Sequence, residues 1–309
     1  MIAEKTYLVP KTITEALQLA QDNAGKFRFI AGGTDLMVNR FQGNDNPICL
    51  IDITKIPDIK GIKDEGTYLR IGSLEILEDL KLNPILQHEF PLLIEAALSV
   101  GAPLLRKTAT IGGNVLCENR CIYYNQSEWW RDSVGYCLKC DGDICIATGG
   151  KKACFSELVS DTAPALIAMD AEIEWVTTNG TQRAKLETIY TGDGVIPRKL
   201  PETAIVTALL LPKNRGFKYT FFKLRERQSL EFTSLTTAVT VDNSGKLKIA
   251  LSGVDPKPVV IEANISENPE TLIKKALKNA RAIDNDMYSR NYRREMIQTH
   301  LRKSFEKLL

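Results

Sequence analysis

Six of the seven cysteines in this chain of 309 residues lie between positions 117 and 154, and only Cys49 lies elsewhere. The six are Cys117, Cys121, Cys137, Cys140, Cys145 and Cys154. Four thiolates can hold a zinc ion or an iron–sulfur cluster. In a reducing compartment, clustered cysteines are more often metal ligands or redox groups than a disulfide framework. The stretch has little apolar periodicity, so it is predicted to be an insertion that something other than a hydrophobic core holds together.

The spacing of these cysteines leaves the metal open. Positions 117, 121, 137 and 140 read C-x3-C-x15-C-x2-C, which is close to a zinc-ribbon spacing. An iron–sulfur cluster and purely structural thiols are the alternatives. Taken alone, these residues favour zinc.

Two Gly-Gly loops are candidates for holding a nucleotide cofactor. Gly32-Gly33 follows a predicted strand at 27–31 and precedes a predicted helix, and TIGGN at 110–114 is a second loop of this kind. Glycine lets backbone N–H groups approach a ligand closely, and a helix start has unpaired donors that suit a diphosphate. Each pair could equally be a simple tight turn. Neither matches G-x-G-x-x-G, so a Rossmann site is not supported.

The composition is that of an ordinary globular protein, with 44% hydrophobic and 25% charged residues. The net charge of +2 argues against a dedicated nucleic-acid binder. No segment approaches the length of a membrane-spanning helix, and the N-terminus does not have the pattern of a signal peptide. We therefore expect a cytoplasmic protein with neither a nucleic-acid nor a membrane partner.

Strand and helix patterns are interleaved along most of the chain, which indicates a mixed α and β fold. A helical pattern is predicted at 74–81, and Asn179-Gly180 predicts a two-residue hairpin turn. Beyond a boundary near Arg215-Gly216, the pattern predicts an antiparallel sheet. Two final helices are predicted near 269–281 and 287–308.

Four motifs in a fixed order carry a family resemblance. They are IAGGTDLM at 30–37, ATIGGNV at 109–115, SDTAPALIAMDA at 160–171 and FFKLRER at 221–227. Together they resemble the FAD-binding subunit of the xanthine dehydrogenase family of molybdenum hydroxylases, over nearly the whole chain. The resemblance implies an α+β fold with a PCMH-type FAD-binding domain at 1–215 and a smaller sheet-plus-helix domain, of the CO dehydrogenase flavoprotein type, at 216–309. The first domain would comprise two α+β subdomains, about 1–57 and 58–215, and the cysteine-rich insertion would span about 117–154.

The resemblance also implies which residues contact FAD. In that family the FAD diphosphate lies along the first glycine loop. The implied contacts are Ile30, Ala31, Gly32, Gly33, Thr34, Asp35, Leu36, Met37, Val100, Thr110, Gly113, Asn114, Asp161, Val206 and Lys223. Without the resemblance, Asp161 could instead cap a following helix and Lys223 could be a solvated strand lysine.

One branch of the family carries a comparable cysteine insertion. In the β subunit of 4-hydroxybenzoyl-CoA reductase, the insertion binds a 4Fe–4S cluster. Its ligand spacing is similar to that of Cys121, Cys137, Cys145 and Cys154, which follow one another in steps of 16, 8 and 9 residues. The resemblance therefore implies a 4Fe–4S cluster rather than zinc and leaves Cys117 and Cys140 without a ligand role.

The implied function is that of an FAD- and 4Fe–4S-containing electron-transfer subunit. The enzyme would remove a phenolic hydroxyl with electrons from a ferredoxin-like donor. With only two histidines and no evident molybdenum site, substrate chemistry is assigned to a partner. The implied partners are a molybdopterin-containing large subunit and a small subunit with two 2Fe–2S clusters, in a dimer of heterotrimers. The alternatives are the FAD subunit of an oxidative hydroxylase acting on a purine, nicotinate or an aldehyde, and a zinc-stabilised non-enzymatic binding module.

Overall fold

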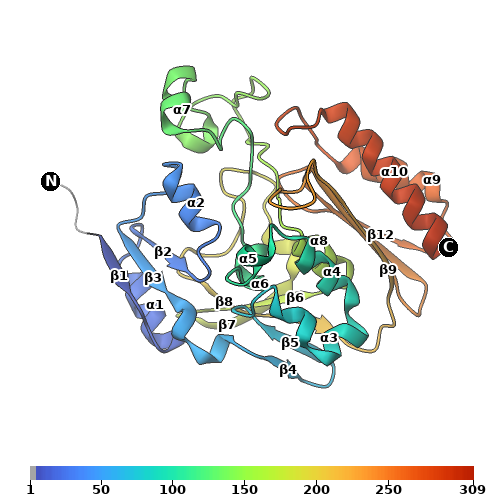
Figure 1. The fold of residues 1–309 in the computed structure, drawn as a ribbon, viewed down its shortest axis with the longest axis horizontal. Coiled ribbons are helices and arrows are strands. Elements are labelled where there is room, and N and C mark those ends of the chain that lie inside the picture. The colour runs from blue at the N-terminus through green and yellow to red at the C-terminus, as the bar shows by residue number, and fades with distance from the viewer. Residues whose placement is uncertain (1–4) are drawn as a thin grey trace.

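The computed structural model describes residues 5–309, whose strands form three sheets with helices around and between them (Figure 1). The predicted α+β class is confirmed, because parallel and antiparallel sheets occupy separate parts of the chain. No helix in this part of the chain is long and apolar enough to cross a membrane.

The first sheet is small and parallel. Its strand order is β1-β3-β2, with β1 at Thr6–Leu8, β2 at Phe27–Ile30 and β3 at Cys49–Asp52. Parallel strands need crossover connections, and helices α1 (Ile13–Asp22) and α2 (Leu36–Phe41) provide them. The connection from β2 to α2 is the first Gly-Gly loop, which therefore lies at the carboxyl end of this sheet.

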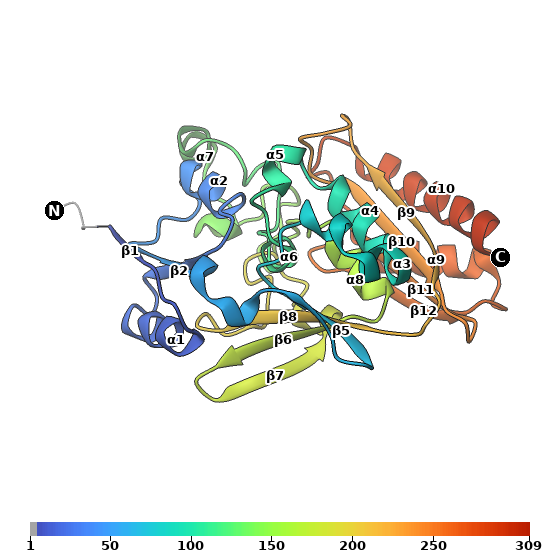
Figure 2. The ribbon, with the colours of Figure 1, turned by 60° about the horizontal axis from the view of Figure 1, so that its bottom comes forward.

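The second sheet has five antiparallel strands in the order β4-β5-β8-β6-β7. Its central strand β8 is buried along nearly its whole length, which explains its continuous apolar sequence IVTALLLP. Helices α3, α4, α6 and α8 lie beside the sheet (Figure 2). The bounds are β4 Ile62–Asp64, β5 Tyr68–Gly72, β6 Glu172–Thr177, β7 Gly180–Lys185, β8 Ile205–Pro212, α3 Pro84–Glu89, α4 Pro91–Ser99, α5 Pro103–Arg106, α6 Ile111–Val115 and α8 Thr162–Ala168.

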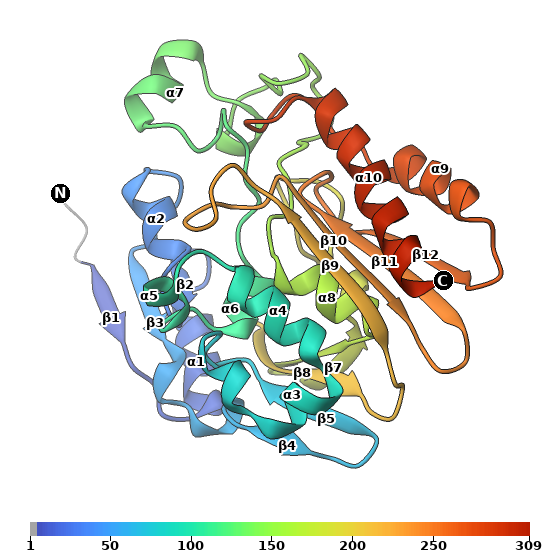
Figure 3. The same ribbon diagram turned by 45° about the vertical axis from the view of Figure 1, so that its right-hand side comes forward.

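The third sheet packs on the other side of this helical layer. Every residue of α8 is buried, because the helix contacts both the α4 side of the core and strands β10 and β11. Helix α10 covers the opposite face of the third sheet (Figure 3). The strand order is β12-β11-β10-β9, all antiparallel. The bounds are β9 Lys218–Leu224, β10 Leu235–Val241, β11 Lys246–Ser252, β12 Val259–Asn264, α9 Pro269–Asn279 and α10 Arg290–Leu308.

The cysteine-rich stretch forms a lobe with little regular structure. Its helix α7 (Glu128–Val134) lies next to α2 in Figures 1 and 3. The buried Arg131 fixes this position by donating to the carbonyl oxygens of Gln42 and Gln126, each at 2.9 Å. The insertion is thus docked on the loop that follows α2.

Candidate functional site

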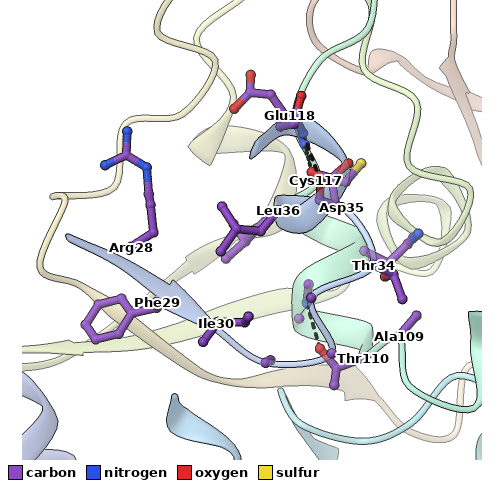
Figure 4. A pocket seen from close by; sticks show the side chains of 18 of the residues that line it. Arg28, Phe29, Ile30, Thr34, Asp35, Leu36, Ala109, Thr110, Cys117 and Glu118 are labelled. Carbon is purple, nitrogen blue, oxygen red and sulfur yellow. Dashed lines mark hydrogen bonds between the residues drawn. The ribbon is translucent and has the colours of Figure 1, made fainter. Parts of the chain in front are cut away.

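A cavity of about 550 Å³ lies where the first Gly-Gly loop, the second Gly-Gly loop and the start of β8 meet (Figure 4). This volume is typical of a site for a small molecule or cofactor. Most of the predicted FAD contacts line it, whereas Met37 and Lys223 do not. The lining residues among those predicted are Ile30, Ala31, Gly32, Gly33, Thr34, Asp35, Leu36, Val100, Thr110, Gly113, Asn114, Asp161 and Val206.

The first loop presents a row of free hydrogen-bond donors. Within residues 5–309, the backbone N–H groups of 32–36 have no protein acceptor. Gly33 has φ +70°, in the left-handed region that favours glycine. At Gly32 an added Cβ would overlap the carbonyl oxygen of Thr108, so the two Gly-Gly loops can approach each other only through glycine. Consecutive free amides form a concave site for an anion such as a diphosphate.

In the second loop, unlike the first, the backbone amides of 111–114 have acceptors within the protein. The amides of Gly112 and Gly113 donate to Ser73 O at 2.9 Å and to the Thr110 hydroxyl at 3.1 Å. Asn114 accepts through its side-chain oxygen from the hydroxyls of Ser160 and Thr162, at 2.9 and 2.6 Å. This orientation leaves the Asn114 amide nitrogen as a donor on the cavity side.

Asp161 reaches the cavity as half of a buried ion pair. Lys223 donates to its carboxylate at 2.6 Å and also to the carbonyl oxygens of Ser99 and Glu231. Burial raises the pKa of Asp161, and the neighbouring ammonium of Lys223 opposes that rise. Lys223 thus holds the carboxylate of Asp161 in place without lining the cavity itself, and its direct contact with the cofactor stays a prediction.

Met37 does not line the cavity either. It belongs to the first turn of α2, where its exposed side chain lines a shallow hollow with Phe41 and Ser127, so its contact with the cofactor stays a prediction. The side chain of Asp161 does not cap α8. The hydroxyl of Ser160 performs that function by accepting from the Ala163 amide at 3.0 Å.

The cysteine-rich insertion contributes cavity residues that the motifs did not reveal. Cys117, Glu118, Tyr124 and Lys139 all line the cavity. Asp35 joins this wall to the first loop, because its carboxylate accepts from the Glu118 amide at 2.8 Å and pairs with the Arg120 guanidinium. No local pattern signals these contacts, since they depend on how the insertion folds back.

Electrostatics at this wall favour an ionised Glu118. Burial opposes ionisation, but the ammonium of Lys139 and the guanidinium of Arg198 outweigh it and lower the pKa of Glu118. Burial raises the pKa of the adjacent Cys117 thiol, to which the carboxylate of Asp35 adds. Cys117 is therefore a neutral thiol in the cavity wall.

The remaining cysteines lie around short loops of the insertion, and all are free thiols. The Cys140 thiol hydrogen-bonds to Cys137 and lowers the pKa of Cys137 to about 6. Burial raises the pKa of Cys121 to about 12, and the nearby Cys154 adds to that rise. Across residues 5–309, however, no three histidine, cysteine or acidic side chains are grouped so that they could hold a metal ion. The structure does not bring Cys121, Cys137, Cys145 and Cys154 together as ligands, so their coordination of a cluster stays a prediction.

Comparisons with known proteins show the family of the chain. The family model for the FAD-binding domain in molybdopterin dehydrogenase matches residues 3–214. The aldehyde oxidoreductase FAD-binding subunit PaoB of Escherichia coli strain K12 is 33% identical over 269 residues, which cover 84% of each chain. The nicotinate dehydrogenase FAD-subunit of Eubacterium barkeri is 26% identical, over 77% of this chain and 70% of the relative.

The fold has a close match among solved structures. A chain of the Cu,Mo-CO dehydrogenase crystal structure superposes with a TM-score of 0.78 at 21% identity, covering 99% of this chain and 98% of that chain. At that identity the match speaks for the fold alone, and the sequence matches carry the family assignment. The chain belongs to the FAD-binding oxidoreductase subunits of the molybdenum hydroxylase family.

Proposed function

We propose that this chain binds FAD in the cavity described above and serves as the flavin- and 4Fe–4S-containing electron-transfer subunit of an enzyme of the 4-hydroxybenzoyl-CoA reductase type. FAD supplies reversible electron transfer between donor and acceptor centres when bound. The chain's own residues bind and orient it. The free amides of residues 32–36 receive the diphosphate, Asn114 and Asp161 contact the polar parts of the cofactor, and Val100 and Val206 pack against it.

One observation carries the choice of enzyme type. Cys121, Cys137, Cys145 and Cys154 have the ligand spacing of the reductase branch and lie in an insertion that also walls the flavin cavity. Burial keeps Cys145 and Cys154 away from water, and low exposure is one of the factors that set a cluster's potential. Binding a cluster requires the loops between positions 137 and 154 to close, and the glycines at 135, 142, 149 and 150 supply backbone freedom for that movement.

The proposal extends to domains and partners. We place the FAD-binding domain at 1–215, divided near 57, and the C-terminal domain at 216–309. The partners are a molybdopterin-containing large subunit, a small subunit with two 2Fe–2S clusters and a ferredoxin-like donor, assembled as a dimer of heterotrimers in the cytoplasm. Substrate would bind to the large subunit and not to this chain.

A second function has support from the relatives. Their names include an aldehyde oxidoreductase of Escherichia coli and a nicotinate dehydrogenase of Eubacterium barkeri. An oxidative molybdenum hydroxylase would use the same FAD cavity, with electrons leaving substrate and reaching the flavin. Only the cysteine insertion separates the two functions, whereas membership of an FAD-binding family argues against the non-enzymatic zinc module.

Activity assays on the complex, purified from its source under anaerobic conditions, distinguish the reductive function from the oxidative one. We expect it to dehydroxylate 4-hydroxybenzoyl-CoA when a low-potential reductant is supplied, and to oxidise aldehydes, nicotinate and purines at least about tenfold more slowly. Product is measured by chromatography. Oxidation of any of these compounds without dehydroxylation of 4-hydroxybenzoyl-CoA would assign the chain to an oxidative enzyme.

A further inference from the structure

The cysteine-rich insertion places a lysine in the wall of the FAD cavity. Lys139 lies on the short turn between Cys137 and Cys140, and its side chain is only 5% exposed. Its ammonium donates to Glu118 at 2.6 Å and to the carbonyl oxygen of Gly194, and it lies 5.1 Å from the centre of the Tyr124 ring. An ammonium has three hydrogens, so these two acceptors leave one hydrogen without an oxygen partner among residues 5–309.

Two cations share one carboxylate at this point of the wall. Glu118 is shared between two cations, since Arg198 donates to the same carboxylate at 3.3 Å. With all three groups ionised, the cluster of Lys139, Glu118 and Arg198 carries one net positive charge. Of the other cations nearby, Arg120 is paired with Asp35, and the more exposed Arg28 contacts two carboxylates, those of Asp45 and Glu202. A largely buried net charge is costly unless an opposite charge meets it.

This cluster lies next to the loop that is proposed to receive the negatively charged diphosphate of FAD. Glu118 is joined to the free-amide loop, because its own amide donates to Asp35. The cation pair therefore lies beside the loop proposed to receive the diphosphate, and both line one cavity. Figure 4 shows Glu118 next to Asp35 of that loop. A diphosphate would supply the missing negative charge and would accept the remaining hydrogen of the ammonium.

We propose that Lys139 is an FAD-binding residue, carried by the insertion, whose ammonium contacts the negatively charged part of the cofactor. The insertion is then part of the flavin site and not only an appended metal lobe. This inference rests on the proposal that FAD occupies this cavity.

The test measures the FAD dissociation constant of full-length apoprotein by quenching of flavin fluorescence. Lys139→Met should weaken binding about tenfold, the loss expected for one charge-assisted hydrogen bond. Lys139→Arg, which keeps the charge, should restore most of the affinity. Lys152→Met is the matched control, because it removes the same charge from an exposed site on the same insertion and should bind FAD like the wild type.

Glu118→Gln distinguishes a direct contact between Lys139 and FAD from a purely structural role of the Lys139–Glu118 pair. If Lys139 acts on FAD, freeing its ammonium from Glu118 should leave the affinity unchanged or raise it. Equal weakening in Lys139→Met and Glu118→Gln would mean that the pair only braces the wall, and wild-type affinity in Lys139→Met would also overturn the inference. Gly33→Val is included in the same series: if it binds FAD normally, the proposed cavity itself is wrong, whichever result Lys139 gives.

Discussion

Replacing Gly33 by valine is expected to weaken FAD binding at least about a hundredfold. The backbone of Gly33 has φ +70°, which a β-branched residue strongly disfavours. The loop must therefore rearrange, and its free amides lose their common direction. Each charge-assisted hydrogen bond is worth about 1.5–3 kcal/mol, and about 1.4 kcal/mol corresponds to a factor of ten in affinity. The loss of two such bonds is therefore enough to weaken FAD binding about a hundredfold.

A matched control for backbone strain is Gly66→Val. Gly66 has φ +80° in the hairpin between β4 and β5, with no atom near its missing Cβ, and it does not line the cavity. Both variants should lose about 1–3 kcal/mol of folding stability through strain. Only Gly33→Val should lose FAD, as measured by fluorescence titration and thermal unfolding of the same samples. Equal FAD affinity in the two variants would contradict the role of this loop.

Serine at any one of Cys121, Cys137, Cys145 and Cys154 is expected to abolish the 4Fe–4S cluster. A hydroxyl is a harder and far less acidic ligand than a thiol, so it does not replace a thiolate at iron. Cluster-containing protein should carry about four iron and four sulfide beyond the share of its partners. The measurement is iron and acid-labile sulfide content after anaerobic purification.

Cys117→Ser and Cys140→Ser are the controls and should retain the iron. Cys117 lines the cavity proposed for FAD, and neither Cys117 nor Cys140 belongs to the proposed ligand set. Zinc bound through Cys117, Cys121, Cys137 and Cys140 would reverse the pattern, with a colourless metal lost from both controls. That outcome would remove the basis for the reductive direction of electron flow.

The FAD affinity of these cysteine variants shows whether the insertion and the glycine loops are coupled. An insertion that folded apart from the glycine loops would leave FAD binding untouched by cysteine replacement. The contacts of Lys139 and Glu118 with the cavity, and of Asp35 with Arg120, show that the two parts are joined. We therefore expect the variants that lose the cluster to bind FAD more weakly as well.

The sequence predicted those elements whose signals are local. A hairpin joins β6 and β7 as expected, but its two turn residues are Thr178 and Asn179, one position before the predicted pair, and Gly180 begins β7 with φ +103°. The two final helices begin after the side-chain caps Asn268 and Ser289. The predicted helix at 74–81 is reduced to a short 3₁₀ helix at Asp79–Leu82, however. Its residues instead bond to distant segments, as when the Leu77 amide donates to Ala109 O at 2.9 Å, and this tertiary pairing overrides the helical periodicity.

In the site, too, the sequence predicted the residues of continuous segments but not the contacts between distant ones. Motifs identified both glycine loops because each loop is a continuous segment of chain. They could not show that Lys223 pairs with Asp161, since that depends on how the third sheet packs against α8. Nor could they place Lys139 in the cavity, because it meets Glu118 only when the intervening residues of the insertion fold back.

Hydrogen–deuterium exchange of the amides at 32–36, with and without FAD, tests the central claim most directly. These amides have no protein acceptor within residues 5–309, whereas those at 111–114 do, so the second loop is an internal reference. The account predicts that one equivalent of FAD slows exchange at 32–36 at least about tenfold, with a much smaller change at 111–114. Stoichiometric FAD binding that leaves exchange at 32–36 unchanged would contradict it.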